Sequence, residues 1–175
     1  MNINEYQNYH ETKAHTSAEF PYNTYLCSIP LDFPGVPLHW HDELELVVIK
    51  RGQGFVSVDF DKRLVHSGDI IIIPPRCLHA IEQDDTFKME YENIIFKPDL
   101  LSSGANDLCM IQYIVPLLDG SLPIEYFLTP ALGSFEALSN CIRQIDLVCA
   151  DQTPGWQLAV KSSLFNFFFL LISER

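Results

Sequence analysis

The chain has 175 residues, of which 47% are hydrophobic, so it can bury a substantial core and is not expected to be disordered. Its 11 Lys and Arg residues against 23 Asp and Glu residues give a net charge of -12, which excludes an extended surface for nucleic-acid phosphates. The five cysteines are scattered and include no C-x-x-C pair, which favours reduced thiols and a cytoplasmic protein over a disulfide framework.

Residues 1–19 are expected to form a polar N-terminal arm. They lack a basic start followed by an apolar stretch, so they are not a secretory signal. A disordered tail is the default expectation for such a segment. His10 and His15 of the arm, like His66 further along, lie in polar stretches and are expected to be exposed to solvent.

Residues 20–98 have the pattern of a β domain. Short segments rich in Val, Ile, Phe and Tyr alternate with turn residues, which predicts an all-β barrel or sandwich. The expected strands are Tyr22–Ile29, Glu43–Ile49, Phe55–Phe60, Asp69–Ile73 and Met89–Phe96. The expected reversals are Asp32–Gly35, Arg51–Gly54, Ser67–Asp69 and Pro74–Pro75. The second strand is apolar on both faces, which predicts that both of its faces are covered.

A connector of mixed structure is expected at residues 99–128. Its segment 107–118 could be a short helix or a strand. Pro116 and Pro123 would break either element.

Two helices are expected in residues 129–175. Thr129-Pro130 and Thr153-Pro154 carry start signals, and the second helix is expected over Trp156–Arg175. The first helix has one apolar stripe, which could be core or a dimer seam: Phe135, Leu138, Ile142, Ile145 and Cys149. The second is apolar around much of its circumference. Its longest apolar run, residues 164–172, is about half of what a membrane span requires, so no such span is expected.

The most informative stretch is His39-Trp40-His41-Asp42-Glu43-Leu44-Glu45. Alternate side chains of a strand share a face, so a strand through this stretch would place His39, His41 and Glu45 together. His79, which follows the Pro74-Pro75 turn, could add a third imidazole. Imidazole nitrogens with a carboxylate suit Zn, Fe, Mn, Ni or Cu better than Ca or Mg. These four residues are therefore the candidate ligands of a divalent transition metal, whereas Trp40 is expected to pack.

At these residues the chain resembles the cupin superfamily. The first cupin motif is matched by His39, His41, Glu45 and Gly52, whereas Gly35 lies two residues too close. The second is matched by Gly68, Pro74 and His79, whereas Arg76 replaces a Gly and Gln83 replaces an Asn. The resemblance implies a mainly β fold, a double-stranded β-helix (jelly-roll) barrel followed here by two C-terminal helices.

A narrower resemblance is to the amino-terminal effector domain of AraC-type transcription regulators. It rests on three features: the residues around both motifs, the segment Tyr91–Pro98, and the closing pair of helices after a connector that contains prolines. In that family the barrel binds a small molecule and the helices dimerise. A linker then leads to a DNA-binding domain with two helix-turn-helix motifs.

The resemblance implies an effector-sensing and dimerisation domain, cut before its DNA-binding domain, that binds a small polar metabolite such as a sugar. The implied ligand-binding residues are His39, His41, Glu45, Arg76 and His79. The implied partners are the effector, a second copy of the chain, and DNA through a domain outside this sequence. An arm of this family can fold over the pocket, which would bring Tyr6, Tyr9 and His10 to the ligand.

Three alternatives stay open. The four candidate ligands could hold a metal, or they could form an interior hydrogen-bond network without one. Arg76 could pair with an anionic effector group, or it could be a solvated loop residue. With a metal, the chain could be a stand-alone cupin enzyme, an isomerase or dioxygenase, although a regulator without enzyme activity is the expected class.

Overall fold

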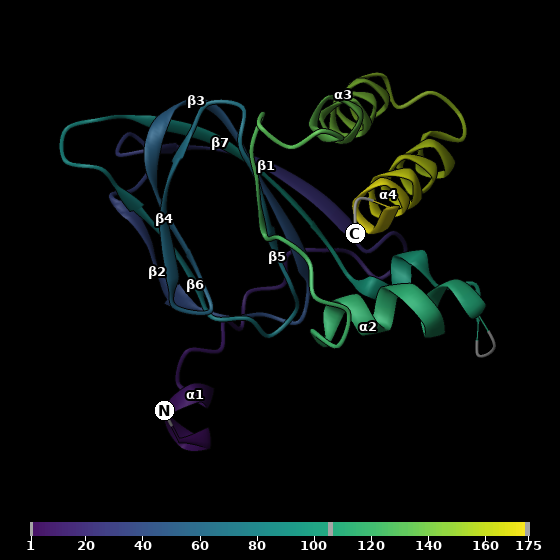
Figure 1. The fold of residues 1–175 in the computed structure, drawn as a ribbon, viewed down its shortest axis with the longest axis horizontal. Helices are drawn as coiled ribbons and strands as arrows, with labels where there is room; N and C mark the ends of the chain where they lie inside the picture. Colours follow the sequence, from purple (N-terminus) through teal and green to yellow (C-terminus); the bar gives the residue numbers. More distant parts are fainter. Residues whose placement is uncertain (1, 105–106, 174–175) are drawn as a thin grey trace. The chain divides into compact units, whose positions relative to one another are not determined.

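The computed structural model describes residues 2–104 and 107–173, so the predicted helix end at Arg175 lies outside the described residues. The chain forms two compact units, a barrel unit (residues 1–97) and a helical unit (residues 98–175). Figure 1 shows the strands of the barrel unit curving around an interior. The predicted mainly β fold with two C-terminal helices is confirmed.

Two antiparallel sheets make up the barrel unit. Its elements are α1 (Ile3–Gln7), β1 (Tyr22–Ile29), β2 (Gly35–His39), β3 (Leu44–Val58), β4 (Asp61–His66), β5 (Ile70–Ile73), β6 (His79–Gln83) and β7 (Met89–Phe96). One sheet contains β1, β7, β3 and β5 in that order, and the other contains β2, β6, β3 and β4. The long strand β3 belongs to both sheets and joins them (Figure 1).

The bend of β3 corrects one prediction. The expected reversal at Arg51–Gly54 is wrong, because β3 runs through these residues without a break. A register shift between Ile49 and Arg51 and the left-handed backbone of Gly52, with φ 78°, turn the strand from one sheet into the other. A Cβ on Gly52 would lie 1.8 Å from the Lys88 carbonyl oxygen, so this position requires glycine.

The apolar strands are the ones that the sequence predicts best. Strands β1 and β7 have the predicted bounds, and β5 begins one residue late. The pattern does not predict β2, β4 or β6. Strand β4 is a mostly exposed strand with charged residues, and β2 contains Pro37, so neither has an apolar alternation. Residues 44–49 of β3 are all buried, which confirms that both faces of this strand are covered.

The N-terminal arm folds onto the barrel, so the expectation of a disordered tail is wrong. The rings of Tyr6 and His10 stack on the Trp40 indole at centroid distances of 4.8 and 4.2 Å. Trp40 Nε1 donates to the Tyr6 carbonyl at 2.8 Å. The backbone adds two bonds, from Trp40 N to Tyr9 O at 3.0 Å and from Glu11 N to Trp40 O at 2.9 Å. Trp40 therefore packs, as predicted, and its partner is the arm.

The helical unit begins with short, irregular turns. Its elements are a 3₁₀ turn η1 (Pro98–Leu101), a π-helical turn η2 (Met110–Ile114), α2 (Val115–Leu118), β8 (Phe127–Leu128), α3 (Phe135–Asp151) and α4 (Trp156–Ser173). The helical alternative for segment 107–118 is therefore the correct one. Pro116 does not break it, because it occupies the first turn of α2, where a backbone donor is not needed.

Helix α3 begins later than predicted, whereas α4 begins at the predicted residue, Trp156. The chain makes a turn after Thr129, and α3 begins only after Ser134. The predicted stripe on α3 is otherwise confirmed, with four of its five members buried and Cys149 half-buried. The two helices contact one another, as in the hydrogen bond from Asn166 Nδ2 to Cys141 Sγ at 3.3 Å.

Helix α4 is long and apolar enough to cross a membrane by length and composition, a test that core helices of soluble proteins also pass. Five of its apolar side chains are buried: Val160, Leu164, Phe167, Phe168 and Leu171. Only 28% of the apolar stretch is buried, so α4 is packed along part of its surface rather than enclosed.

Candidate functional site

The structure brings together four of the residues that the sequence singles out. His39 ends β2, His41 lies in the turn that follows, Glu45 lies in β3 and His79 begins β6. The prediction of a single strand through residues 39–45 is wrong, because the chain turns at residues 41–43 between β2, which pairs with β6, and the start of β3, which pairs with β5. Convergence comes instead from the pairing of β2 with β6, which sets His39 opposite His79.

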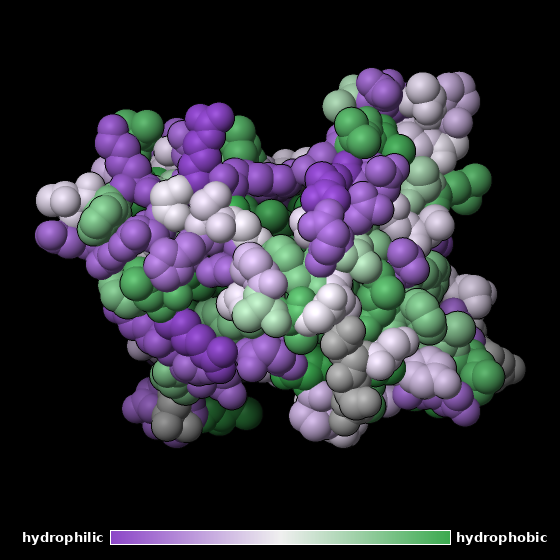
Figure 2. Space-filling view, turned by 45° about the horizontal axis from the view of Figure 1, so that its top comes forward, coloured by the Kyte–Doolittle hydropathy of each residue, from purple (hydrophilic) through white to green (hydrophobic). Residues whose placement is uncertain are grey.

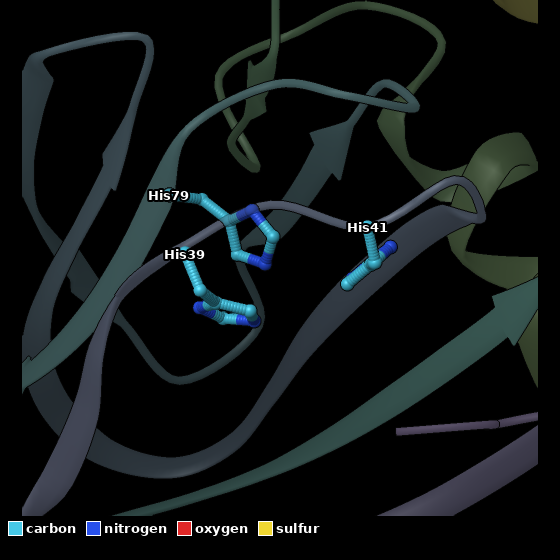
Figure 3. Close-up of side chains that lie close together, drawn as sticks. All are labelled: His39, His41 and His79. Carbon is cyan, nitrogen blue, oxygen red and sulfur yellow. The ribbon is translucent and has the colours of Figure 1, made fainter. Parts of the chain in front are cut away.

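The three imidazoles are close enough to share one ligand. Figure 3 shows the rings of His39 and His79 next to each other, with His41 to one side. The ring centroids of His39 and His79 are 4.1 Å apart, and those of His41 and His79 are 5.0 Å apart. One nitrogen from each ring lies within 4.8 Å of the others.

Backbone carbonyls fix two of the three rings. His39 Nδ1 lies 2.9 Å from the Pro37 carbonyl oxygen, and His79 Nδ1 lies 2.9 Å from that of Cys77. A carbonyl can only accept, so each Nδ1 carries the hydrogen and each neutral ring keeps a lone pair on Nε2. His79 is 1% exposed, and its Nε2 makes no hydrogen bond.

Glu45 supplies negative charge beneath the rings. Its Oε2 accepts from His41 Nε2 at 2.9 Å and lies 3.4 Å from His79 Nε2. Burial alone would raise the pKa of Glu45, but the two imidazoles lower it well below its usual range. Burial likewise opposes the charged form of His41, but the bond to Glu45 raises the pKa of this imidazole. Burial and the neighbouring His79 lower the pKa of His39.

This donor set fits a divalent transition metal. Three imidazoles and one carboxylate are suitable ligands, and carbonyls that hold the Nδ1 hydrogens orient two of the rings as metal-bound histidines commonly are. The buried Nε2 of His79 lacks a partner that a metal would provide. Such a metal would be held by His39, His41, Glu45 and His79, and it would act as a Lewis acid toward a polar ligand atom.

A cavity of about 540 Å³ extends from this cluster into the barrel unit. It is lined by His39, His41, Glu45 and His79, by polar groups of β1 and β7 such as Tyr25 and Asn93, and by apolar residues such as Ile81 and Ile95. The Asn93 Oδ1 atom is buried without a hydrogen-bond partner. The cavity therefore combines an apolar wall with a few polar atoms that can orient a ligand.

Three residues of the arm, Glu11, Lys13 and His15, also line this cavity, and the sequence does not predict them. His15 is 8% exposed, so its predicted exposure is wrong, whereas His10 and His66 are exposed as predicted. Glu11 Oε2 lies 2.8 Å from His15 Nε2 and 3.5 Å from His39 Nε2. The i, i+4 spacing of Glu11 and His15 is the only sequence signal for the pair. Tyr6 and His10 pack on Trp40 and are not among the residues lining the cavity.

Arg76 does not join the cluster. Its guanidinium is 72% exposed and its Nε donates to Asp42 Oδ1 at 2.8 Å. This bond lowers the pKa of Asp42. Arg76 lines a separate surface hollow with Tyr6 and Phe60, so the structure favours the solvated-loop alternative over a contact with a ligand in the barrel.

Two sheets that share a bent strand, closed around an interior with three imidazoles and a carboxylate, define a cupin. Residues 34–168 match the AraC-like ligand binding domain, so the chain belongs to this family, as the resemblance implies.

Two curated relatives are HTH-type transcriptional regulators of Bacillus subtilis. YdeC is 32% identical over 159 residues, which cover 90% of this chain and 54% of YdeC. YbfI is 26% identical over 72 residues, which cover 41% of this chain and 26% of YbfI. The chain thus spans about half the length of YdeC. Among solved structures, a cupin protein from Bacteroides fragilis is 24% identical with a TM-score of 0.43, covering 50% of this chain and 80% of that one.

Proposed function

We propose that the chain is the effector-sensing and dimerisation domain of an AraC-type transcription regulator, without enzyme activity of its own. The effector is a small polar metabolite such as a sugar, bound in the barrel cavity. Membership of the AraC-like ligand binding family supports a sensing role. The cavity volume of about 540 Å³ lies within the range of small-molecule sites.

The observation that carries this proposal is the set of buried polar atoms without partners at the cavity wall. They include His79 Nε2 and Asn93 Oδ1. A buried polar atom without a hydrogen bond costs about 1–3 kcal/mol. A ligand with several hydroxyl groups supplies both donors and acceptors to such atoms.

The sensing mechanism is a shift between two arrangements of the domain. An effector that binds one arrangement better than the other changes their populations by its difference in affinity. The output passes to a DNA-binding domain outside this sequence, in the cytoplasm. The net charge of -12 agrees with DNA contacts that lie elsewhere.

Thermal unfolding against a panel of sugars, sugar acids, polyols and amino acids tests the sensing role. A true effector raises the unfolding temperature, because it binds the folded state alone. His79→Ala abolishes this rise, whereas the control His66→Ala, at an exposed histidine of the same unit, leaves it unchanged. No shift with any class of metabolite would contradict the proposal.

The dimerisation role is supported by an exposed apolar stripe on α4. Leu158, Phe165 and Phe169 are 74%, 36% and 64% exposed and follow at spacings of seven and four residues. Figure 2 shows hydrophobic residues at the surface of the helical unit. Sedimentation velocity should detect a dimer that Phe169→Ser weakens and Leu26→Ser, at an exposed barrel residue, does not.

A metal-dependent cupin enzyme is the second candidate, and the three clustered imidazoles favour it. In that function His39, His41, Glu45 and His79 hold the metal and the substrate occupies the cavity. Turnover of a cavity-sized substrate that chelators abolish and a stoichiometric metal restores would replace the sensing proposal.

A further inference from the structure

The N-terminal arm places a second carboxylate against the histidine cluster. Glu11 Oε2 is 3.5 Å from His39 Nε2, and Glu11 lies outside both cupin motifs. His15 Nε2 donates to the same oxygen at 2.8 Å, and the His15 ring lies 5.4 Å from that of His41. The arm thus adds a carboxylate and an imidazole to the four residues from the motifs.

Glu11 and Glu45 meet the cluster in the same way. Each has one oxygen that accepts from one histidine and faces the Nε2 atom of another, at 3.5 Å for His39 and 3.4 Å for His79. The Nδ1 atoms of both rings donate to backbone carbonyls, so in the neutral rings the Nε2 lone pairs are available to a cation that the carboxylate oxygens also contact. The arrangement occurs twice in the cluster.

The position of Glu11 is built by contacts that do not involve the cluster. On one side, Glu11 N donates to the Trp40 carbonyl, and Tyr6 and His10 stack on the Trp40 ring. On the other side, the His15 carbonyl accepts from Asn23 Nδ2 at 2.9 Å. Residues 10–15 are therefore fixed to the barrel unit at both ends, and the Glu11 carboxylate is held against His39.

We propose that Glu11 is a second carboxylate of the site, and that the arm and the histidine cluster together bind one divalent transition-metal cation. The unpartnered, buried Nε2 of His79 is the independent sign that the cluster lacks a ligand. The inference rests on the proposed function in one respect, because the cation and the proposed effector would bind in the same cavity. The cation is the ligand itself or the contact for an oxygen of the effector.

The proposal links cation binding to the docking of the arm. Binding that uses Glu11 stabilises the docked arm, and by reciprocity a loosened arm binds the cation more weakly. Tyr6→Ala removes a ring that stacks on Trp40 and a hydroxyl that donates to the Arg76 carbonyl, and it leaves every cavity residue in place. Tyr6→Ala should therefore weaken cation binding from outside the site.

Cobalt(II) titration of the untagged chain, followed by calorimetry and by the visible absorption of the bound ion, tests the inference. Glu11→Gln should weaken binding about 10-fold or more, an effect typical of groups that support a metal site. Glu19→Gln is the matched control, since Glu19 is an exposed carboxylate of the same arm that does not line the cavity. His79→Ala should abolish binding.

Trypsin provides a second readout that does not depend on affinity. Lys13 is the only Lys or Arg in residues 1–19 and is exposed, so cleavage after Lys13 reports the release of the arm. Cobalt(II) should slow this cleavage in the wild type and in Glu19→Gln, but not in Glu11→Gln. Circular dichroism shows whether each variant has kept the fold.

Two results would overturn the inference. One is cobalt(II) binding by Glu11→Gln as tight as by the wild type, and the other is a cleavage rate at Lys13 that the cation does not change. The sensing role is judged separately by the metabolite panel. Glu11-dependent cation binding without any metabolite response would refute the sensing role alone, and the opposite pair of results would refute the inference alone.

Discussion

The barrel unit and the helical unit bury different kinds of side chain. Within the described part of the chain, all buried polar or charged residues belong to the barrel unit: His15, His41, Glu43, Glu45, Ser57, Asp69 and His79. The buried side chains of the helical unit are hydrophobic throughout, and exposed apolar residues such as Phe169 lie on its surface. Buried polar groups need specific partners and exposed apolar groups are suited to an interface, so the proposed ligand recognition is assigned to the barrel unit and the proposed dimerisation to the helical unit.

The largest expected effect compares two glycines with the same backbone conformation, one in each unit. Gly52 and Gly120 both have φ 78°. A Cβ at Gly52 meets the Lys88 carbonyl oxygen at 1.8 Å, whereas a Cβ at Gly120 meets nothing within 4 Å. We expect Gly52→Ala to lower the free energy of unfolding by about 5 kcal/mol or more. Gly120→Ala should cost only the left-handed strain, about 1 kcal/mol.

Urea unfolding followed by circular dichroism measures both glycine variants. If both variants lose the same free energy of unfolding, the cost at Gly52 comes from the left-handed backbone alone. The close approach of Lys88 would then not exclude a side chain at the bend that joins the two sheets.

The next effect compares two phenylalanines of α4 that lie two residues apart. Phe167 is fully buried and Phe169 is 64% exposed. Phe167→Ala should lower the free energy of unfolding by about 3–4 kcal/mol through the loss of burial and the cavity left behind. Phe169→Ala should change it by less than about 0.5 kcal/mol at a protein concentration where the chain is monomeric. A large loss from Phe169→Ala in the monomer would show that this ring is part of the core.

How much of the fold can be predicted depends on what each strand contacts. Strands β1, β5 and β7 carry apolar residues whose burial is visible in the sequence pattern, and their bounds are correct to within a residue. Strand β4 pairs with β3 through the hairpin at Asp59–Phe60 but is mostly exposed, so it has no apolar alternation. Strand β6 is held by a pairing to β3 that is distant in the sequence, and this long-range contact leaves no local pattern. For the same reason, the glycines of β3 resemble a hairpin turn although the strand continues.

The candidate site likewise contains residues that the sequence predicts and residues that it does not. His39, His41, Glu45 and His79 could be predicted because their spacing matches two motifs, although they meet through strand pairing rather than along one strand. Glu11 and His15 could not, because a polar arm has the composition of a solvated tail. Their positions depend on the stacking of Tyr6 and His10 on Trp40, a tertiary contact with no signature in the sequence.

Glu45→Gln tests the buried charge that distinguishes the barrel unit. The lowered pKa of Glu45 contributes stability that is present above the unfolded value of about 4.3 and is lost as the pH falls below it. The raised pKa of His41 contributes stability that is present below about 6.5 and is lost as the pH rises through the folded value. Glu45→Gln should therefore flatten the stability profile on both sides, by about 1–3 kcal/mol near pH 6.

Urea unfolding from pH 3 to pH 9 gives this profile. Glu82→Gln is the matched control, because Glu82 forms an exposed ion pair with Lys62 in the same unit and should leave the profile nearly unchanged. A profile of Glu45→Gln that keeps both slopes of the wild type would show that other groups set the pH dependence.

The smallest effect compares one thiol from each unit. Burial raises the pKa of Cys77 to about 11, whereas Cys109 is exposed. At pH 8 only about 0.1% of Cys77 is thiolate, so iodoacetamide should label it at least about 10-fold more slowly than Cys109 in the folded chain. Labelling of Cys77 should then rise about 10-fold per pH unit up to pH 10, measured by mass spectrometry of peptides, with urea-unfolded chain as the control. Equal rates at pH 8 would contradict the burial of Cys77. If the Cys77 thiol is unreactive, the contribution of Cys77 to the site comes from its backbone carbonyl, which orients His79.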